Sequence, residues 1–526
     1  MPIALDQLPD DIDALKSLVA DQATKLDHFT ARNEQLTTEN QHYKTQVLTL
    51  TEQLNLALAR RYVASSEKLS PDQIRLFDEA ESEAASAVDV DDDVIIVPAH
   101  KRKKRGRKLL PDNLPRIDVV HEIPESARYC DHDGQLLVEI GEAISEQLDI
   151  IPAKIQVIRH VRKKYACNCG QCIKTAPLPA QPIPRSMASP GLLAHITISK
   201  YQDALPLYRQ ETILQRIGVD IPRATLANWM IQAGTLIQPL INLMQDRLLA
   251  YDIIQMDETT VQVLKEDGKA AQSKSYLWLQ RGGPPEQPVV LYDYDPGRGA
   301  GVPTRLLSGF TGYLQTDGYD GYNAVVANNK LMHVGCMAHA RRKFSEAVKA
   351  QGKKKKEGKA HRGLALIRKL YRVEKQARKL DPEDRHARRQ KQARPVLDEL
   401  RSWLDEVLPQ VPPTSATGKA LSYLHNEWSK LVRYLDDGRL EIDNNGAENA
   451  IRPFVVGRKN WLFSASVKGV KASANLYSLI ETAKANSLEP YAYLRYLFTE
   501  LPKAGTVEAI EALLPGNLSK DQIRIG

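Results

Sequence analysis

The run DIIQMDETTVQVL (residues 252–264) decides the kind of domain that the C-terminal half of this 526-residue chain forms. It is the first of three successive apolar-rich runs, and KSYLWLQRG (274–282) and QPVVLYDYDPGRG (287–299) are the next two. Each run is bounded by charged residues, glycine or proline, as is typical of β-strands. The sequence therefore predicts three strands in succession from Tyr251 onward.

A helix and further strands are predicted after these runs. VPTRLLSGF (302–310) resembles a helix, and TGYLQTDGYDGY (311–322) contains a fourth strand. HVGCMAHARRKFSEAVKA (333–350) begins as a strand and continues as a helix. This order of elements is that of the ribonuclease-H-like fold, which is built on a mixed α/β sheet. The next segment, from Lys349 to about Leu435, is basic and predicted to be helical, which indicates an insertion into that fold.

A seven-residue repeat runs without a break near the N-terminus. Its a positions are Ile12, Val19, Leu26, Asn33, Asn40, Val47 and Leu54, and its d positions are Leu15, Gln22, Phe29, Leu36, Tyr43, Leu50 and Ala57. Asparagine at an a position fixes the register of parallel two-stranded coiled coils. We therefore expect a coiled coil that joins two copies of the chain. The alternative is one amphipathic helix that lies on another domain.

An acid-rich linker and a basic arm, KRKKRGRK (101–108), follow the repeat. This mixture of charged and small residues buries too little apolar surface to fold by itself. The glycine-centred arm resembles segments that enter the DNA minor groove, which makes Arg102, Arg105 and Arg107 candidate DNA contacts. A flexible tether is the alternative interpretation.

The chain has five cysteines, and four of them lie close together in the sequence: Cys130, Cys167, Cys169 and Cys172. In a cytosolic protein such clustering favours a metal site over disulfides. Cys130 with His132 or Asp133, and Cys167 with Cys169 or Cys172, would provide two ligand pairs on either side of strand-like sequence. We expect a small zinc-ribbon-like module with a structural Zn²⁺, and free thiols are the alternative.

Two helices joined by a short turn are predicted in YRQETILQRIGVDIPRATLANWMIQAG (208–234). Gly218 is predicted to end the first helix, and Pro222 is placed in the first turn of the second. The inner face of the second helix is expected to consist of Leu226, Trp229, Met230 and Ala233, and its outer face of Arg223, Thr225, Asn228 and Gln232. This pattern resembles a helix-turn-helix whose second helix contacts DNA bases, although many helical hairpins bind nothing.

The net charge of the chain is +7, but its positive charge is concentrated in two blocks. The basic arm is one, and residues 349–394 are the other, with 18 Lys and Arg against 5 Asp and Glu. Such concentration favours a polyanionic partner. The N-terminus lacks the features of a secretion signal, and no apolar run approaches the length of a membrane-spanning helix. We expect a cytoplasmic protein with no membrane partner.

Two aspartates close predicted strands. Asp257 ends IIQMD, and Asp317 ends the fourth strand beside Gly318. Ionised carboxylates lose solvation there, and Mg²⁺ is the natural compensation. A third carboxylate from a helix would complete a site for two ions, and Glu448 in DNNGAENAIRP (443–453) is the candidate. Glu448 could instead serve only its partner Arg452. Other acidic residues compete for these roles: Asp252, Glu258, Asp293, Asp295, Asp320 and Asp443.

Long strings along nearly the whole chain resemble the insertion-sequence-sixty-six family of bacterial transposases. They include CDHDG, SEQLDIIPAKIQVIRHVRKKYAC, SKYQDALPLYRQE, QMDET, LQTDGYDGY, GCMAHARRKF, DNNGAENAIRPFVVGRKNWLF and LYSLIETAKANSLEPYAYLRYL. The resemblance implies a ribonuclease-H-like fold and an Asp-Asp-Glu triad with two Mg²⁺ or Mn²⁺ ions. Position by position the triad falls on Asp257, Asp317 and Glu448. Many relatives carry a second cysteine where this chain has Asp133.

The implied function is a DDE transposase that binds the terminal inverted repeats of an insertion sequence, cleaves one DNA strand and joins it to target DNA. The partners would be DNA, a second copy of the chain and small accessory proteins of the same element, in association with the nucleoid. Further candidate DNA contacts are Arg341, Arg342, Arg452, Arg458, Lys459 and Trp461. Cys336 and His339 are interpreted as a core cysteine and a histidine near the active site rather than as a second metal site. A ribonuclease-H-like nuclease or resolvase, and a dimeric DNA-binding regulator without catalysis, are the alternatives.

A chain of this length is expected to form three or more domains. The predicted parts are, in order, a dimerising coiled coil (1–62), an acidic linker and basic arm (63–115), a zinc-finger-like module (116–182), a helix-turn-helix region (183–250), the first part of the catalytic core (251–348), a basic helical insertion (349–435), the second part of the core (436–500) and a C-terminal tail (501–526).

Overall fold

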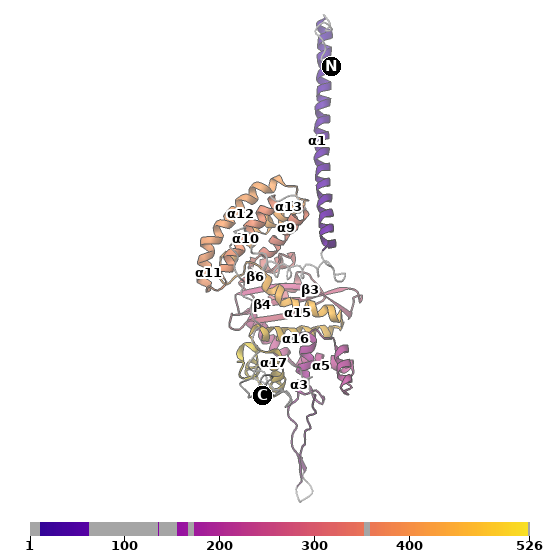
Figure 1. The fold of residues 1–526 in the computed structure, drawn as a ribbon, viewed down its shortest axis with the longest axis vertical. Helices are drawn as coiled ribbons and strands as arrows, with labels where there is room; N and C mark the ends of the chain where they lie inside the picture. The colour runs from indigo at the N-terminus through magenta and orange to yellow at the C-terminus, as the bar shows by residue number, and fades with distance from the viewer. Residues whose placement is uncertain (1–10, 63–134, 136–154, 167–172, 352–357, 524–526) are drawn as a thin grey trace. The chain divides into compact units, whose positions relative to one another are not determined.

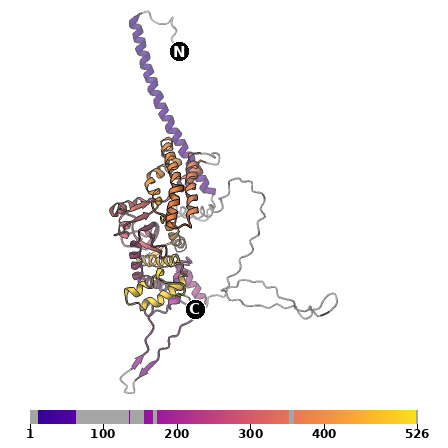
Figure 2. The ribbon, with the colours of Figure 1, turned by 90° about the vertical axis from the view of Figure 1, so that its left-hand side faces the viewer.

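The computed structural model describes residues 11–62, 135, 155–166, 173–351 and 358–523 (Figures 1 and 2). The chain divides into two compact units, one made of residues 1–80 and 180–526 and the other of residues 81–179. Within the described part of the chain, every helix is too short or too polar to cross a membrane. Sheet and helices are mixed in the C-terminal region, and a long helix lies at the N-terminus.

A mixed sheet is the centre of the larger unit, and it contains β3 (Ile253–Lys265), β4 (Lys274–Gly282), β5 (Val289–Asp295), β6 (Tyr313–Gln315) and β7 (Met332–Val334). The strand order is β5-β4-β3-β6-β7. β3, β4 and β5 pair antiparallel, whereas β6 pairs parallel with both β3 and β7. The strands predicted from the apolar runs are therefore confirmed. A short strand that was not predicted, β8 (Ser464–Ser466), pairs with the end of β3.

Helices surround this sheet (Figure 1). They are α3 (Pro190–Tyr201), α4 (Leu207–Arg216), α5 (Arg223–Leu236), α6 (Gln238–Leu249), α7 (Gly301–Leu306), α8 (Asn323–Asn329), α9 (Met337–Ala350), α10 (Lys359–Ala377), α11 (Pro382–Arg388), α12 (Arg394–Val407), α13 (Ala416–Asn426), α14 (Trp428–Leu431), α15 (Asn445–Trp461), α16 (Val467–Ala485), α17 (Pro490–Glu500) and α18 (Val507–Glu511). α15 packs on β3 and β4, and α16 packs on β5 and α5. At Gly234 a Cβ would lie 2.6 Å from the Cα of Ala472, so α5 and α16 approach closely only because this residue is glycine.

The helical hairpin formed by α4 and α5 agrees with the predicted faces. Leu226, Trp229, Met230 and Ala233 are buried, whereas Arg223 and Asn228 are exposed and Thr225 and Gln232 are half-buried. Gly218 adopts a left-handed conformation with φ of 80°, just after the end of α4. Pro222 is the N-cap of α5 and precedes its first turn, one position earlier than predicted. Its φ of −60° suits either position because the proline ring fixes that angle.

The helices from α9 to α13 (residues 337–426) are called the helical segment below, and the N-terminal helix α1 (Ile12–Tyr62) contacts α9 and α13 of this segment through one face near its end. The Glu52 carboxylate accepts a hydrogen bond of 2.7 Å from the N–H of Ala416, the first residue of α13. The Asn55 amide donates one of 2.8 Å to the carbonyl of Ala350, the last residue of α9. Both side chains thus satisfy polar groups at helix ends. The apolar seam of the heptads is on another face and is exposed, as at Val47 (63%) and Leu50 (64%).

The smaller unit contains a hairpin of β1 (Lys164–Ala166) and β2 (Ile173–Thr175), paired antiparallel from Lys164 with Thr175 to Ala166 with Ile173. The predicted zinc ligands Cys130, His132, Asp133, Cys167, Cys169 and Cys172 lie outside the described residues, as do Arg102, Arg105 and Arg107 of the basic arm.

Arg389 stabilises the helical segment from inside. Its side chain is fully buried and donates to both carboxylate oxygens of Glu374 at 2.9 and 2.8 Å. It also donates to three backbone carbonyls in the segment that leads toward α15, those of Tyr434, Asp437 and Leu440. A charge buried this deeply is tolerated because every polar contact is made.

We expect Arg389→Leu to lower the free energy of unfolding by about 3–5 kcal/mol, because it leaves Glu374 buried without its cation. Urea unfolding of the full chain measures this effect. Arg394→Leu is the matched control, since Arg394 is exposed, and its effect should stay within about 0.5 kcal/mol. Equal effects of the two substitutions would contradict the role given to Arg389.

Candidate active site

Asp257 and Asp317 are brought together by parallel pairing of β3 with β6. The last paired residues are Gln255 and Gln315, and each aspartate lies two residues beyond its glutamine. On the edge of β3 that faces β6, the pairing with β6 ends at Gln255, and a pairing with β8 begins at Val263. Among the described residues no strand pairs with β3 on that edge between these two points, and side chains from both faces of β3 reach the same space there.

Glu448 reaches this space because α15 begins against β3. The amide side chain of the buried Asn444 donates to the carbonyl of Met256 at 2.8 Å, and its backbone N–H donates to the Cys336 thiol at 3.2 Å. The N–H of Met337 donates to the carbonyl of Ile442 at 3.1 Å. These contacts hold the residues before α15 between β3 and the start of α9. Glu448 follows in the first turn of α15, where it is buried.

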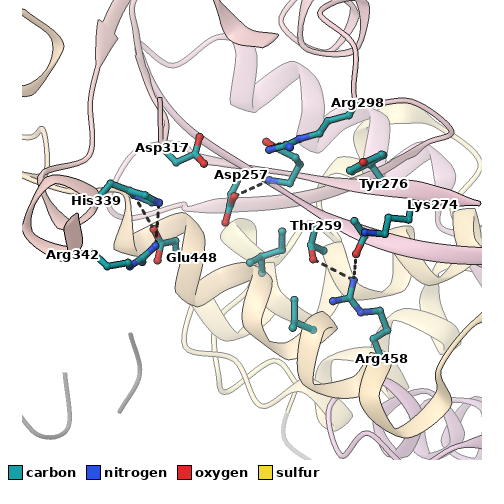
Figure 3. Close-up of a pocket in the computed structure, with 14 residues that line it drawn as sticks. Asp257, Thr259, Lys274, Tyr276, Arg298, Asp317, His339, Arg342, Glu448 and Arg458 are labelled. Atoms are coloured by element: carbon teal, nitrogen blue, oxygen red, sulfur yellow. Dashed lines mark hydrogen bonds and ion pairs between the residues drawn. The ribbon is translucent and has the colours of Figure 1, made fainter. Parts of the chain in front are cut away.

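The side chains around this space line a pocket, which Figure 3 shows with the two aspartates and Glu448 from three different elements. The lining residues are Asp257, Glu258, Thr259, Thr260, Lys274, Tyr276, Arg298, Asp317, His339, Arg342, Glu448, Ile451, Val455 and Arg458. Four carboxylates and four Lys or Arg residues therefore face one volume. The three carboxylates predicted to act together all belong to this set.

Burial raises the pKa of Asp257 well above its usual value, and the negative charges of Glu258 and Asp317 raise it further. The N–H of Glu258, which donates to Asp257 Oδ1 at 2.8 Å, and the charge of Arg298 oppose that rise. Burial and Asp317 likewise raise the pKa of Glu258. Within the described part of the chain, no group donates a hydrogen bond to the buried Oε1 of Glu448. Crowded carboxylates with an unsatisfied oxygen form a donor set that suits a divalent cation.

Asp317 is oriented by the turn that follows β6. Its Oδ1 accepts a hydrogen bond of 3.0 Å from the N–H of Tyr319, and its carbonyl accepts one of 3.2 Å from the hydroxyl of Tyr423 in α13. Gly318 adopts a φ of 91°, and a Cβ there would lie 3.4 Å from the same hydroxyl. Glycine thus allows the chain to turn sharply after the aspartate.

The acidic residues that compete with this trio have other partners. Glu258 accepts from Arg298 on one oxygen and from the Tyr322 hydroxyl on the other. The remaining ones are paired away from the pocket: Asp252 with Arg439, Asp293 and Asp295 with Arg305, Asp320 with Asn323, and Asp443 with Tyr371. The choice of Asp257, Asp317 and Glu448 stays a prediction, and these pairings of the competing residues favour it.

Cys336, His339 and Glu448 form a second group of possible metal ligands, with ligand atoms all within 4.8 Å of one another. His339 Nδ1 lies 3.8 Å from Glu448 Oε1. Burial raises the pKa of the Cys336 thiol, which already accepts the hydrogen bond from Asn444. Cys336 is thus a core residue, as predicted, and His339 lies beside the candidate active site.

The predicted DNA contacts around α9 and α15 have varied surroundings. Arg342 lines the pocket, and Arg341 lies over the ring of Tyr371 at 5.1 Å. Arg458 is buried, lines the pocket and donates to the hydroxyls of Thr259 and Thr260 at 3.3 and 3.2 Å. This geometry is that of a residue that braces the open edge of β3.

Three other candidates in α15 lie along its length. Arg452 makes no ion pair with Glu448 among the described residues, so the local pairing considered from the sequence is absent there. Lys459 is half-buried. The ring of Trp461 packs edge-on against Phe454, with centroids 5.3 Å apart, and Lys200 lies 5.6 Å from it. Trp461 therefore has core contacts on one side.

Arg298, Lys274 and Tyr276 line the pocket but were not predicted to do so. Arg298 comes from the PGRG loop after β5, whose glycine and proline marked a strand end but gave no indication of function. It contacts Glu258 across the sheet, and no spacing rule in the sequence joins these two residues.

Family models match most of the chain. The transposase IS66 family matches residues 185–472, the zinc-finger binding domain of transposase IS66 matches 127–170, and the IS66 C-terminal element matches 478–515. A fourth model, transposase C of IS166 homeodomain, matches 49–119. The chain is also similar to uncharacterized proteins of Sinorhizobium fredii. It is 32% identical to y4qI over 99% of both chains, and 35% identical to y4jD over 80% of this chain and 85% of that one.

We expect Asp257→Asn to raise the melting temperature by a few degrees in EDTA at neutral pH. A carboxyl whose pKa is raised by folding costs stability once it ionises, so the wild-type protein should lose stability as pH rises above the unfolded-state value near 4. The Asp257→Asn substitution removes this loss of stability. Thermal unfolding at several pH values measures the effect, and Asp320→Asn, at an exposed position, is the control. Mg²⁺ should raise the melting temperature of wild type more than that of Asp257→Asn. A lower melting temperature for Asp257→Asn in EDTA would contradict this account.

Proposed function

The chain belongs to the transposase IS66 family, and from that premise we propose that it is a DDE transposase that cleaves the ends of an insertion sequence and joins them to target DNA. The family models make it a transposase that binds DNA. The observation that carries the catalytic part is the shared pocket of Asp257, Asp317 and Glu448, which are distant in sequence and come from three elements.

A ribonuclease-H-like catalytic core, in two parts with a helical insertion, is part of this proposal. The sheet order β5-β4-β3-β6-β7 supports it, with three antiparallel strands followed by two parallel ones. So does the position of the two aspartates, on the central strand and at the end of its parallel neighbour. α15 returns to the sheet after the helical segment and supplies the third carboxylate.

Asp257, Asp317 and Glu448 would hold two Mg²⁺ or Mn²⁺ ions. The residues fit such ions because the charges of Asp257 and Asp317 repel one another and because no described residue donates a hydrogen bond to the buried Oε1 of Glu448. When bound, the ions would supply positive charge that activates the attacking oxygen and stabilises the leaving one.

The chain's own residues bind and orient the DNA strand in this proposal. Lys274, Arg298 and Arg342 offer cationic groups around the carboxylates, so backbone phosphates are attracted to the pocket. In the first reaction a water oxygen forms a bond to phosphorus and the transposon 3′ oxygen leaves as a hydroxyl. In the second, that hydroxyl forms the new ester and a target 3′ oxygen leaves. Each step exchanges one P–O bond for another, and no nucleotide cofactor is required.

DNA recognition would use parts outside the catalytic core. Arg223 and Asn228 are exposed on α5, with Thr225 and Gln232 beside them, and suit contact with base edges. The zinc-finger match at residues 127–170 supports a structural Zn²⁺ held by four of Cys130, His132, Asp133, Cys167, Cys169 and Cys172. The basic arm and the helical insertion would bind phosphates. Accessory proteins of the same element and association with the nucleoid belong to the same proposal.

A second copy of the chain is the proposed partner of α1. Most of its a and d residues are exposed, for example Leu26 (67%) and Phe29 (64%). Apolar residues in this spacing are stabilised when two helices pack them into each other's gaps. The face that contacts α9 and α13 carries Glu52 and Asn55, which are neither a nor d positions. Docking on the helical segment therefore leaves the seam available for pairing.

We expect Asp317→Asn and Glu448→Gln each to reduce Mg²⁺-dependent cleavage of labelled transposon-end DNA by about a thousand-fold or more, because several kcal/mol of transition-state stabilisation would be lost. DNA binding should change little. Asp293→Asn is the matched control, since Asp293 is acidic, lies on the same sheet and is paired with Arg305.

The same assay distinguishes the alternatives. A regulator without catalysis would give no cleavage with any of these proteins, including wild type. A nuclease or resolvase would cleave the end DNA but give no joined products with a plasmid target. Joined products that require all three carboxylates would support the transposase.

We expect the double substitution Leu26→Glu and Phe29→Glu to convert a dimer into a monomer at micromolar concentration, because charge is placed in the apolar seam. Light scattering coupled to size exclusion measures the mass. Thr24→Glu with Thr38→Glu is the control, since both threonines are exposed outside the seam. A dimer that persists in the seam variant would show that α1 does not hold the copies together.

A further inference from the structure

Arg298 is held at the edge of the candidate active site by a buried carboxylate. Its Nε and one terminal nitrogen donate to Glu258 Oε1 at 2.9 and 2.6 Å. The Glu258 side chain is 2% exposed, whereas that of Arg298 is 43% exposed. One end of the ion pair is therefore fixed inside the protein and the other reaches the surface of the pocket.

Two tyrosines restrict the same guanidinium. The Tyr319 ring lies 3.9 Å from it and the Tyr276 ring 6.0 Å, so the cation is stacked against aromatic faces. The Tyr319 hydroxyl also donates to the backbone carbonyl of Arg298 at 2.7 Å. A long side chain that is held at both its head group and its backbone loses little further freedom on binding.

Glu258 is fully occupied by this arrangement. Its other oxygen accepts a hydrogen bond of 2.7 Å from the buried hydroxyl of Tyr322, whose ring packs edge-on against Tyr319 at 6.0 Å. A carboxylate with both oxygens engaged is a poor competitor for a cation in the pocket. Glu258 comes directly after Asp257 in β3. By holding Arg298, it therefore fixes the position of Arg298 relative to that aspartate.

We propose, building on the proposed function, that Arg298 binds a phosphate of the DNA strand that lies in the catalytic pocket, and that Glu258 and Tyr319 are positioning residues for it. The second terminal nitrogen of Arg298 donates to no residue in the described part of the chain, so one edge of the planar guanidinium is left to bind an anion. Guanidinium binds phosphate oxygens through paired N–H groups. Asp257 and Asp317 line the same pocket as Arg298, so a phosphate bound by Arg298 would lie near the one that reacts in the proposed function.

The test is a binding map with single neutral methylphosphonates along a labelled duplex of the element's terminal repeat, measured in EDTA so that no cleavage occurs. A methylphosphonate at the contacted phosphate should weaken binding by the wild-type protein about five- to tenfold. The same methylphosphonate should not change binding by Arg298→Ala, because that variant lacks the contact. Arg305→Ala is the matched control, because Arg305 is exposed beside the same strand and pairs with Asp293 and Asp295. A map that is identical for wild type and Arg298→Ala would overturn the proposal.

Arg298→Ala leaves Glu258 buried without its cation and could unfold, so Arg298→Ala combined with Glu258→Gln is the second variant. It removes both charges and should give the same map. Tyr319→Leu tests positioning: the phosphate contact should persist in the map, while Mg²⁺-dependent cleavage falls about tenfold through kcat rather than KM. Unchanged kcat in Tyr319→Leu would remove Tyr319 from the proposal. Failure of wild type to cleave would refute the proposed function, yet the binding map would still decide the role of Arg298.

Discussion

The contact between the Asn444 side chain and the carbonyl of Met256 determines where α15 begins, and the candidate active site depends on it. Asn444 is fully buried, and it joins β3 to the start of α9 through Cys336. Glu448 is one helical turn further on, so its position follows from that of Asn444. The helical segment before it is stabilised separately by Arg389. The third carboxylate can therefore lie far along the chain from the aspartates and still reach them.

The antiparallel half of the sheet was predictable from the sequence because β3, β4 and β5 are long apolar runs with clear ends. The buried face of α5 was predictable for a similar reason, since apolar residues at helical spacing lie on one face of the helix and that face packs into the core. β8 was missed because three residues, Ser464 to Ser466, carry no apolar pattern and are strand only through pairing with β3. The trio of carboxylates could not be chosen from spacing, and the family resemblance selected it. The structure adds the partners that occupy the competing acidic residues.

The roles of Glu258 and Arg298 were not predictable, and the reason is physical. Adjacent residues on a strand normally point to opposite faces of a sheet, so Asp257 and Glu258 were not expected to face one volume. They do so because, among the described residues, no strand pairs with β3 on one edge between Gln255 and Val263, and both side chains line the pocket at that gap. The gap also accounts for the buried Arg458, which donates to Thr259 and Thr260 and braces β3 where it pairs with β4 on its other edge only.

The docking of α1 through Glu52 and Asn55 has a geometric consequence for any pair of chains joined along its seam. Each residue turns an α-helix by about 100°, so the angle between the docked face and the seam is set by the number of residues between them. Inserting one residue between the seam and the turn that carries Glu52 and Asn55 would rotate the twofold axis of the pair around each catalytic core. Inserting seven residues would nearly preserve the direction of that axis and would only increase the distance between the two cores. In such a pair the length of the helix would set the mutual orientation of the two candidate active sites, and variation among relatives in multiples of seven would be the evolutionary trace of that constraint.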